Sequence, residues 1–448
     1  MRVFEGSLLT FSTRFLSAAL SLLAGIITAR ALGPDGKGQY TLIILLPTLL
    51  IYIGHAGLGA SSVYFIGKRR YTVAEVTSNL MISAIAIGGM LLVLGLVGIL
   101  GFNPTFLKDV DRTHITLAIM VTPILLLHTY LMWILLAEQK IREYNILDIS
   151  RPFGLLIALI FLIIILRGGV FGATIAYIVS AVSSCILGMH LIRRTAKITW
   201  SLDFRVIGAL LWFGLKNHLG GIAQFLDYRL NLFLVGHFLA VTAVGHYSIS
   251  IAVAETLWYI PTGVALVLLP KISSVETTEA SMLTPIYCRG VFFVTAVLSI
   301  CYALIGRMII PFVFGREFSP SVRPLLFLLP GVALFSIPKV LSSDFIGRGK
   351  PMLNTYIAFA SLAVVTILSL FLIPRFGLIG AAVASSSAYC TSSVLSLLTF
   401  WKLTEISPTS VLRPRLADLQ LYKVSLARVL AGIHWKRAIG RPHGDNVG

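Results

Sequence analysis

Six charged side chains interrupt segments of the chain that are otherwise apolar. They are Arg14, Lys216, Asp227, Arg229, Glu255 and Lys339. A charge in hydrocarbon is costly, so it usually faces a cavity or a partner. Four of the six are cations, and an interior that gathers them would be net positive. A positive, water-filled cavity suits a phosphate-bearing ligand, because arginine contacts replace the hydration of the phosphate oxygens.

The spacing of these residues separates them into groups. Asp227 and Arg229 are two residues apart, so on a helix they project to different sides and each needs another partner or water. Lys216 and Lys339 lie near the predicted inner ends of their helices, and we interpret both as extending to lipid headgroups. Arg14 lies about two turns into the first helix, where extension to headgroups and a functional role stay equally open. The deeper residues Asp227, Arg229 and Glu255 favour a functional role.

Other kinds of chemistry find little support in the sequence. The glycine-rich segment 33–38 lacks the spacing, and the Ser or Thr after Lys37, that a phosphate-binding loop needs. Asp109 and Asp111 form a carboxylate pair in a short predicted outer loop with no folded domain around it. The nine histidines show no zinc-ligand spacing, and the four cysteines are scattered singly. We therefore predict no catalytic residues, no metal and no cofactor, and a protein that is not an enzyme.

The elements that position the charged residues are membrane-spanning helices. Hydrophobic residues make up 57% of the 448, charged residues 12%, and the mean hydropathy is +0.91. Charge-free runs are long enough to cross a ~30 Å hydrocarbon core as helices, and they lack the alternation of a β-barrel. The sequence predicts an all-α polytopic membrane protein with about twelve helices, near residues 8–31, 38–66, 76–100, 113–136, 146–166, 170–192, 208–238, 243–269, 286–310, 322–343, 353–373 and 377–401.

The basic residues indicate topology. With a cytoplasmic amino terminus, 23 of the 36 Lys and Arg residues fall on the inner side and nine in outer loops. The positive-inside rule then places both termini in the cytoplasm. The formal charge of +18 is thus explained by the membrane and does not call for nucleic acid as a partner. The basic tail, residues 406–448, could lie on anionic headgroups or be a solvated segment.

An internal repeat divides the chain into two halves. Leu32, Gly38 and Tyr40 recur as Leu239, Gly245 and Tyr247, displaced by 207, and Pro123 recurs as Pro330. Gly169, Gly172, Ala173 and Ala176 recur as Gly377, Gly380, Ala381 and Ala384, displaced by 208. We predict two parallel-repeat bundles of six helices, residues 1–200 and 201–405. Transporters built in this way hold substrate between the halves and rock one half against the other.

The chain resembles the polysaccharide-biosynthesis (Wzx-type) flippases of the multidrug/oligosaccharidyl-lipid/polysaccharide exporter superfamily. The matching segments cover both halves: Ala29 to Tyr40 (ARALGPDGKGQY), Asp227 leading into Leu234 to Leu239 (LVGHFL), Val244 to Ser248 (VGHYS), Pro270 with Ser273, and Pro374 to Ala382 (PRFGLIGAA). The resemblance implies two six-helix bundles that move undecaprenyl-pyrophosphate-linked sugar units from the inner to the outer leaflet of a bacterial cytoplasmic membrane. One departure is that Arg229 follows Asp227 after Tyr228, where adjacent Asp and Arg are expected.

The resemblance and the charges together give the predicted substrate-binding set. Arg14 and Arg229 are expected to attract the pyrophosphate, with Arg30 and Lys216 as further cations, and Asp227 and Glu255 to orient these cations or couple to ions. The expected partners are the lipid-linked oligosaccharide, membrane lipids and the glycan polymerase machinery. A cation-coupled multidrug exporter and a membrane-embedded polysaccharide polymerase or ligase remain as alternatives. The first would favour an acidic, aromatic cavity, and the second a large outer loop.

Overall fold

The computed structural model describes residues 2–102, 104–193 and 200–413, without the side chains of residues 2–8, 216–217 and 277–278, and every regular element in these ranges is helical. The helices of the first half are α1 (Arg2–Gly54), α2 (Leu58–Gly67), α3 (Val73–Phe102), η1 (Thr105–Leu107), α4 (Arg112–Met120), α5 (Thr122–Ala137), α6 (Ile141–Leu159), η2 (Ile160–Ile165) and α7 (Gly169–Arg193). Those that follow are α8 (Phe204–Phe238), α9 (Val241–Glu255), η3 (Thr256–Trp258), α10 (Tyr259–Ser274), α11 (Thr277–Phe314), η4 (Arg316–Ser321), α12 (Val322–Gly347), α13 (Met352–Thr404) and α14 (Pro408–Leu412).

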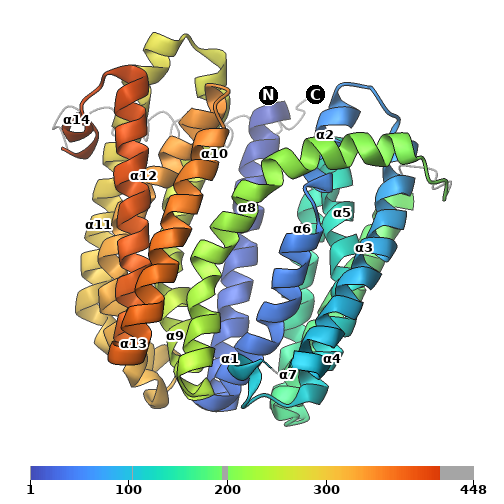
Figure 1. Ribbon diagram of the computed structural model, residues 1–448, viewed down its shortest axis with the longest axis vertical. Coiled ribbons are helices and arrows are strands. Elements are labelled where there is room, and N and C mark those ends of the chain that lie inside the picture. Colours follow the sequence, from blue (N-terminus) through green and yellow to red (C-terminus); the bar gives the residue numbers. More distant parts are fainter. Residues whose placement is uncertain (1, 103, 194–199, 414–448) are drawn as a thin grey trace, which may run out of the picture.

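The number of membrane crossings agrees with the prediction. Nine helical segments are long and apolar enough to span a membrane, and α8, bent by 51° between Phe204–Leu215 and His218–Phe238, makes a tenth. Helices α1 and α13 each contain 53 residues and are broken at Gly33 and Gly377, where each reverses direction (Figure 1). Counted as two spans each, they bring the described part of the chain to twelve crossings.

Glycines in a left-handed conformation make the reversals. Gly33 has φ +67°, which a residue without a Cβ adopts at little cost, and Pro34 then starts the next helix. Gly377 has φ +58°, and Gly169, the residue 208 positions earlier, has φ +57°. The repeat found in the sequence therefore corresponds to a repeated backbone turn.

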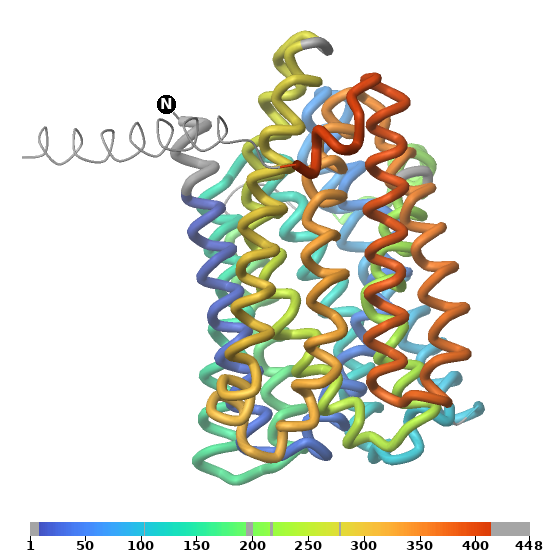
Figure 2. The backbone as a smooth tube through the Cα atoms, turned by 90° about the vertical axis from the view of Figure 1, so that its left-hand side faces the viewer, coloured from blue at the N-terminus to red at the C-terminus, as the bar shows by residue number. Residues whose placement is uncertain are grey.

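The helices form two bundles that share one core at one end and separate at the other (Figure 1). Buried apolar residues of α1, α4, α8, α9, α11 and α12 make one continuous cluster that includes Leu42, Ile119, Val235 and Phe314. Towards the opposite end each bundle has a cluster of its own, around Leu80 in the first and Phe345 in the second. Figure 2 shows the helices running lengthwise beside one another, with α11 reaching beyond its neighbours.

The shared end is closed by two glycines that the repeat relates. A Cβ at Gly38 would lie 1.9 Å from the carbonyl oxygen of Val241, and one at Gly245 would lie 2.0 Å from that of Pro34. Val241 and Gly245 follow Pro34 and Gly38 by the same 207 positions, so the contact is reciprocal, as a two-fold axis between the halves requires. The hydroxyl of Thr242 also donates to Asp35, its own counterpart in the repeat, at 3.3 Å.

Helix α8 connects the two bundles. Val206 and Leu210 in its first segment are buried in the core of the first bundle, and the carbonyl of Leu210 accepts a hydrogen bond from Ser61 at 2.7 Å. The rest of α8 packs along α13. The segment Phe204–Leu215, just after the predicted boundary near residue 200, therefore packs on the first bundle. The boundary itself remains a prediction.

The start of the predicted tail folds back on the second bundle. Helix α14 packs against α11, Val411 is buried, and Arg289 donates to the carbonyl of Ser410 at 2.6 Å. Residues 414–448, which make up most of the predicted tail, lie outside the described residues.

Candidate functional site

A cavity of about 410 Å³ lies between the two bundles. Its walls come from both halves: Phe11, Arg14, Phe15 and Ser17 of α1 and Asp148 of α6 on one side, and Glu255, Trp258, Tyr259, Thr262, Gly263, Leu266 and Lys339 on the other. Arg14 and Asp148 stand near the beginnings of their helices, and Glu255 stands 14 residues, or about 21 Å, from the closed contact at Val241. The cavity thus lies in the separated part of the molecule.

Arg14 brings a cation to this cavity without a partner of its own. Its side chain is exposed and makes no hydrogen bond or ion pair with any residue that the structure describes. The nearby carboxylate of Asp148 accepts a hydrogen bond from Ser17 at 3.1 Å. Arg14 can therefore bind an anionic ligand without first breaking an internal ion pair.

Arg229 is held in a closed pair. Its two terminal nitrogens donate to the two carboxylate oxygens of Glu255 at 2.8 and 3.1 Å, a bidentate geometry that links α8 to α9. The side chains are 29% and 22% exposed, so the pair is only partly desolvated. Arg229 and Glu255 thus neutralise one another in this arrangement, and a ligand would have to compete with Glu255 for the guanidinium.

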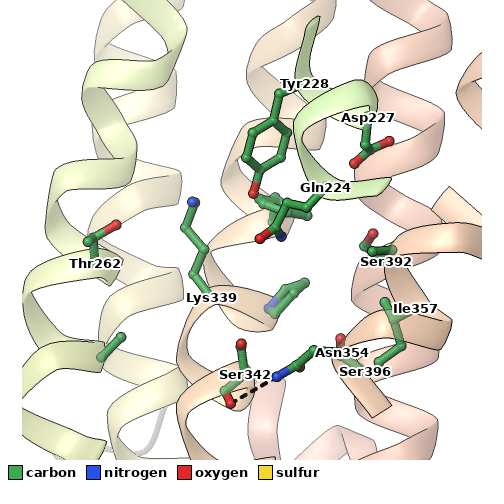
Figure 3. Close-up of a pocket in the computed structure, with 14 residues that line it drawn as sticks. Gln224, Asp227, Tyr228, Thr262, Lys339, Ser342, Asn354, Ile357, Ser392 and Ser396 are labelled. Atoms are coloured by element: carbon green, nitrogen blue, oxygen red, sulfur yellow. Dashed lines mark hydrogen bonds between the residues drawn. The ribbon is translucent and has the colours of Figure 1, made fainter. Parts of the chain in front are cut away.

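Asp227 points away from Arg229, as the two-residue spacing predicts. It is 3% exposed, and one carboxylate oxygen accepts a hydrogen bond from Ser361 of α13 at 2.9 Å. It also lines a second cavity of about 220 Å³ inside the second bundle (Figure 3). Asp227 therefore faces the second cavity, whereas the Arg229–Glu255 pair lies beside the cavity between the bundles.

Lys339 corrects the interpretation made from the sequence. Instead of extending to headgroups, its ammonium lies 4.5 Å from the ring centroid of Trp258 and 5.4 Å from those of Tyr228 and Phe335. The side chain borders both cavities and in Figure 3 it points into the space between α10 and α8. It forms no ion pair with a carboxylate of the described residues, and its contacts are cation–π contacts with these aromatic faces.

The charges around the cavities are balanced. Arg14, Arg229 and Lys339 are opposed by Asp148, Asp227 and Glu255. The spans gave four cations and two anions. The balance here differs because Asp148, at the predicted start of the fifth span, also faces the cavity, and because the side chain of Lys216 lies outside the described residues. What distinguishes the cations is availability: Arg14 and Lys339 have no anionic partner among the described residues, whereas Arg229 has one.

Of the predicted set, Arg14 and Glu255 line the cavity between the bundles, Arg229 is paired with Glu255 beside it, and Asp227 lines the second cavity. Arg30 lies at the closed end, about 24 Å along α1 from Arg14, and donates to the carbonyls of Val313, at 2.8 Å, and Phe312 at the end of α11. A substrate-binding role for Arg30 stays a prediction. The side chain of Lys216 lies outside the described residues.

Sequence reasoning missed three groups at the cavity. Lys339 was assigned to the headgroups, Asp148 was not singled out, and Trp258 carries no charge to draw attention. The indole nitrogen of Trp258 is buried beside the cavity without a hydrogen-bond partner in the described part of the chain. A cluster of aromatic residues around an isolated lysine was the available signal, but Tyr228, Trp258 and Phe335 lie far apart in sequence.

Comparisons with known proteins identify a family from the sequence and a shared fold from the solved structures. A family model described as "Polysaccharide biosynthesis protein" matches residues 27–323. A "Putative O-antigen transporter" of Shigella flexneri is 22% identical over 389 residues, covering 80% of this chain and 88% of that protein. Among solved structures, the lipid II flippase MurJ in an inward closed conformation superposes with a TM-score of 0.74 at 14% identity, covering 96% of this chain and 99% of that one. An inward-facing multidrug resistance MATE family transporter gives 0.68 at 14% identity, covering 90% and 99%.

Proposed function

The chain belongs to the polysaccharide biosynthesis protein family, and from this premise we propose that it is a flippase for a polyprenyl-pyrophosphate-linked oligosaccharide. It would move the headgroup from the cytoplasmic to the outer leaflet of a bacterial inner membrane, with both chain ends in the cytoplasm. The distribution of Lys and Arg supports this orientation. The MurJ structure, described as a lipid II flippase, supports a lipid-linked substrate, and the Shigella relative, described as an O-antigen transporter, supports a glycan substrate.

One observation carries the proposal: the cavity between the bundles offers an uncommitted cation from each side. Arg14 comes from the first bundle and Lys339 from the second. A pyrophosphate that contacts both would replace the weak ring contacts of Lys339 with charge-assisted hydrogen bonds. Thr262 and the indole of Trp258 add neutral donors around the same space.

The same arrangement suggests how binding favours movement. A ligand shifts a conformational equilibrium only if it binds one state more strongly. Phosphate bound to Arg14 and Lys339 together is stabilised when the bundles approach at this end, and the contact of Gly38 with Gly245 must then separate at the other. With a negative cytoplasm, each negative charge carried outwards gains roughly 2.3 kcal/mol per 100 mV.

The proposal is tested by leaflet transfer in proteoliposomes. The purified protein is reconstituted with a labelled undecaprenyl-pyrophosphate oligosaccharide, and exposure of label on the opposite leaflet is followed over time. We expect transfer by the wild type and a fall of at least about tenfold in Arg14→Ala and in Lys339→Ala, since each loses one charge-assisted contact. Arg323→Ala is the matched control, because Arg323 lies on the same helix as Lys339 and is exposed. Wild-type rates in both cavity variants would refute the proposal.

A second function, a cation-coupled multidrug exporter, is favoured by the aromatic and acidic share of the same cavity. Phe11, Phe15, Trp258 and Tyr259 line it beside Asp148 and Glu255. The two functions separate in one experiment with a lipophilic cationic dye. If the dye is exported, and Lys339→Ala speeds its export while leaving lipid-linked glycan transfer unchanged, the exporter function replaces the flippase.

The glycan polymerase machinery is the expected protein partner, because it would consume the transported units. Co-purification with labelled polymerase from the same cells is the measurement that checks this partnership.

A further inference from the structure

The second cavity, which lies inside the second bundle, has a lining unlike that of the first. It measures about 220 Å³ and is built from α8, α10, α12 and α13 (Figure 3). Most of its polar lining residues are neutral: Gln224, Tyr228, Thr262, Ser342, Asn354, Ser392 and Ser396. A concave site with several convergent hydrogen-bonding groups is the usual form of a small-molecule site.

Two serines of α13 turn unused hydroxyl groups towards this cavity. Ser392 is 3% exposed and Ser396 2% exposed, yet neither hydroxyl has a hydrogen-bond partner among the described residues. The neighbouring Ser393 behaves ordinarily, because its hydroxyl donates to the carbonyl of Tyr389 four residues earlier at 2.7 Å. Because both serines line the cavity, their hydroxyls can donate to and accept from a ligand that occupies it.

The remaining polar groups also have capacity to spare. Asn354 uses its amide nitrogen on the carbonyl of Ser342 at 3.3 Å, which leaves its side-chain oxygen available (Figure 3). Asp227 uses one carboxylate oxygen on Ser361, and its second oxygen has no hydrogen-bond partner in the described part of the chain. The side chain of Gln224 is exposed to the cavity and likewise makes no hydrogen bond to a described residue.

The charge and shape of this cavity define the ligand. Asp227 and Lys339 carry opposite charges, so the lining as a whole is neutral. The rings of Tyr228 and Phe335 and the aliphatic side chains of Ile357 and Pro338 add apolar faces. A neutral ring with many hydroxyl groups, able to donate and accept on its edge and pack on its faces, matches this combination.

We propose that this cavity binds one sugar ring, the ring joined to the phosphate of the transported lipid. The inference rests on the proposed function, in which Lys339 contacts the pyrophosphate. Lys339 and Thr262 border both cavities, so a phosphate at Lys339 places its attached sugar at the entrance to the second cavity. The volume lies below the ~300–1,000 Å³ of pockets that enclose larger ligands, and therefore admits a single residue of the glycan.

Binding to the full-length protein in lipid nanodiscs tests the assignment. The probes are undecaprenyl pyrophosphate without sugar and undecaprenyl-pyrophosphoryl monosaccharides carrying a hexose, an N-acetylhexosamine or a 6-deoxyhexose, each scored by native mass spectrometry. We expect at least one glycosylated probe to bind the wild type about tenfold more tightly than the bare pyrophosphate. Equal binding of all four probes overturns the proposal.

The variants localise the sugar. The double variant Ser392→Ala with Ser396→Ala should bind the preferred glycosylated probe about tenfold more weakly, because two neutral hydrogen bonds are lost. Its affinity for the bare pyrophosphate lipid should not change. Ser393→Ala is the matched control on the same helix. An equal loss for both lipids, or no loss for either, counts against the sugar site.

A further variant separates this inference from the proposed function. Ser396→Leu fills the cavity and should abolish the preference for glycosylated lipid while the bare pyrophosphate lipid still binds. An unchanged thermal unfolding midpoint would show that the variant is folded. If the folded variant keeps the preference, the assignment is wrong. Lys339→Ala should weaken all four probes together. If Lys339→Ala and Arg14→Ala leave the affinity for all four probes unchanged, while the serine variants still lose affinity for the glycosylated probe alone, the proposed pyrophosphate site is wrong and the sugar site is supported.

Discussion

The interiors of the two bundles occupy equivalent places in the repeat but differ in chemistry. In the second bundle the hydroxyl of Tyr247 bonds to Ser385 at 3.1 Å, and Asn231 donates to Ser385 at 2.6 Å and to the carbonyl of Ala381 at 3.0 Å. In the first bundle the matching positions hold Tyr40, Tyr177 and Ala24. The hydroxyls of Tyr40 and Tyr177 are buried without a partner in the described residues.

The charges differ as well. The first bundle encloses Lys37, which donates to Thr28 at 2.8 Å and lies 5.8 Å from the ring of Tyr40, and Arg151, which lies 5.4 Å from the ring of Tyr177. Neither cation has a carboxylate partner among the described residues. The second bundle instead contains Asp227 and the Arg229–Glu255 pair. At these matching positions a common backbone thus carries a hydrogen-bonded network in the second copy and unpartnered hydroxyls in the first, while cations without a carboxylate partner in the described part of the chain occur in both, Lys37 and Arg151 in the first and Lys339 in the second.

The largest expected effect tests whether the copies are equivalent at their contact. Gly38→Val and Gly245→Val place a Cβ 1.9 and 2.0 Å from a backbone carbonyl oxygen. The helices can relieve this overlap only by moving apart, so we expect a loss of stability beyond the ~1–3 kcal/mol of ordinary overpacking. Both variants should slow leaflet transfer by about tenfold or more and expose Thr242→Cys to a membrane-impermeant maleimide, in a background without native cysteines. A strong effect from one glycine alone would break the two-fold relation.

Asn231→Ala makes the second bundle resemble the first. It removes two donated hydrogen bonds and the one that Ser369 gives to Asn231, leaving buried groups unsatisfied at a cost of about 2–4 kcal/mol. The thermal unfolding midpoint in detergent should fall clearly. Ala24→Ser, at the matching position, provides the comparison and should change it little. An unshifted midpoint in Asn231→Ala would mean that the network does not stabilise the second bundle.

Removing one cation from each bundle should give different results. Arg229→Met leaves Glu255 without its partner, and we expect a loss of about 1–3 kcal/mol, less than for a fully buried pair because both side chains are partly exposed. Arg151→Met removes a cation that no carboxylate offsets, so stability should be unchanged or higher. Chemical unfolding of the two purified variants checks the signs, and equal destabilisation would contradict the comparison.

The smallest effects come from single hydroxyl groups. Tyr247→Phe removes the hydrogen bond to Ser385 and should lower the free energy of unfolding by about 0.5–1.5 kcal/mol. Tyr40→Phe removes a hydroxyl that has no hydrogen-bond partner among the described residues and should not change it measurably. Unfolding curves collected in parallel are sufficient. A loss in Tyr40→Phe equal to that in Tyr247→Phe would reveal a partner for Tyr40, such as bound water.

The fold was predictable because its signals are local. Continuous apolar runs gave twelve spans, and the repeated glycines Gly169 and Gly377 marked a turn that the structure makes with nearly the same φ in both halves. The predicted gap between residues 31 and 38 corresponds to the break at Gly33 inside α1. Periodicity alone could not show that Phe204–Leu215 packs on the first bundle.

The site was predictable only where it depended on one helix. The separation of Asp227 from Arg229 followed from their spacing, but the choice of Glu255 as the partner of Arg229 did not. Lys339 was misjudged because its surroundings come from three different elements, α8, η3 and α12, which meet only in the folded chain. The hydroxyls of Ser392 and Ser396, which have no hydrogen-bond partner among the described residues, could not be distinguished in the sequence from the many serines that bond within their own helix.

The reciprocal crossing of Gly38 and Gly245 has an evolutionary consequence. It has the symmetry of the contact that a six-helix unit would make with an identical copy of itself, as expected if the two halves arose by duplication and fusion. Fusion released the copies from identity, since a change in one no longer had to be tolerated twice around the axis. Position 244 can therefore hold valine where its counterpart is Lys37, and position 335 phenylalanine where its counterpart is His128.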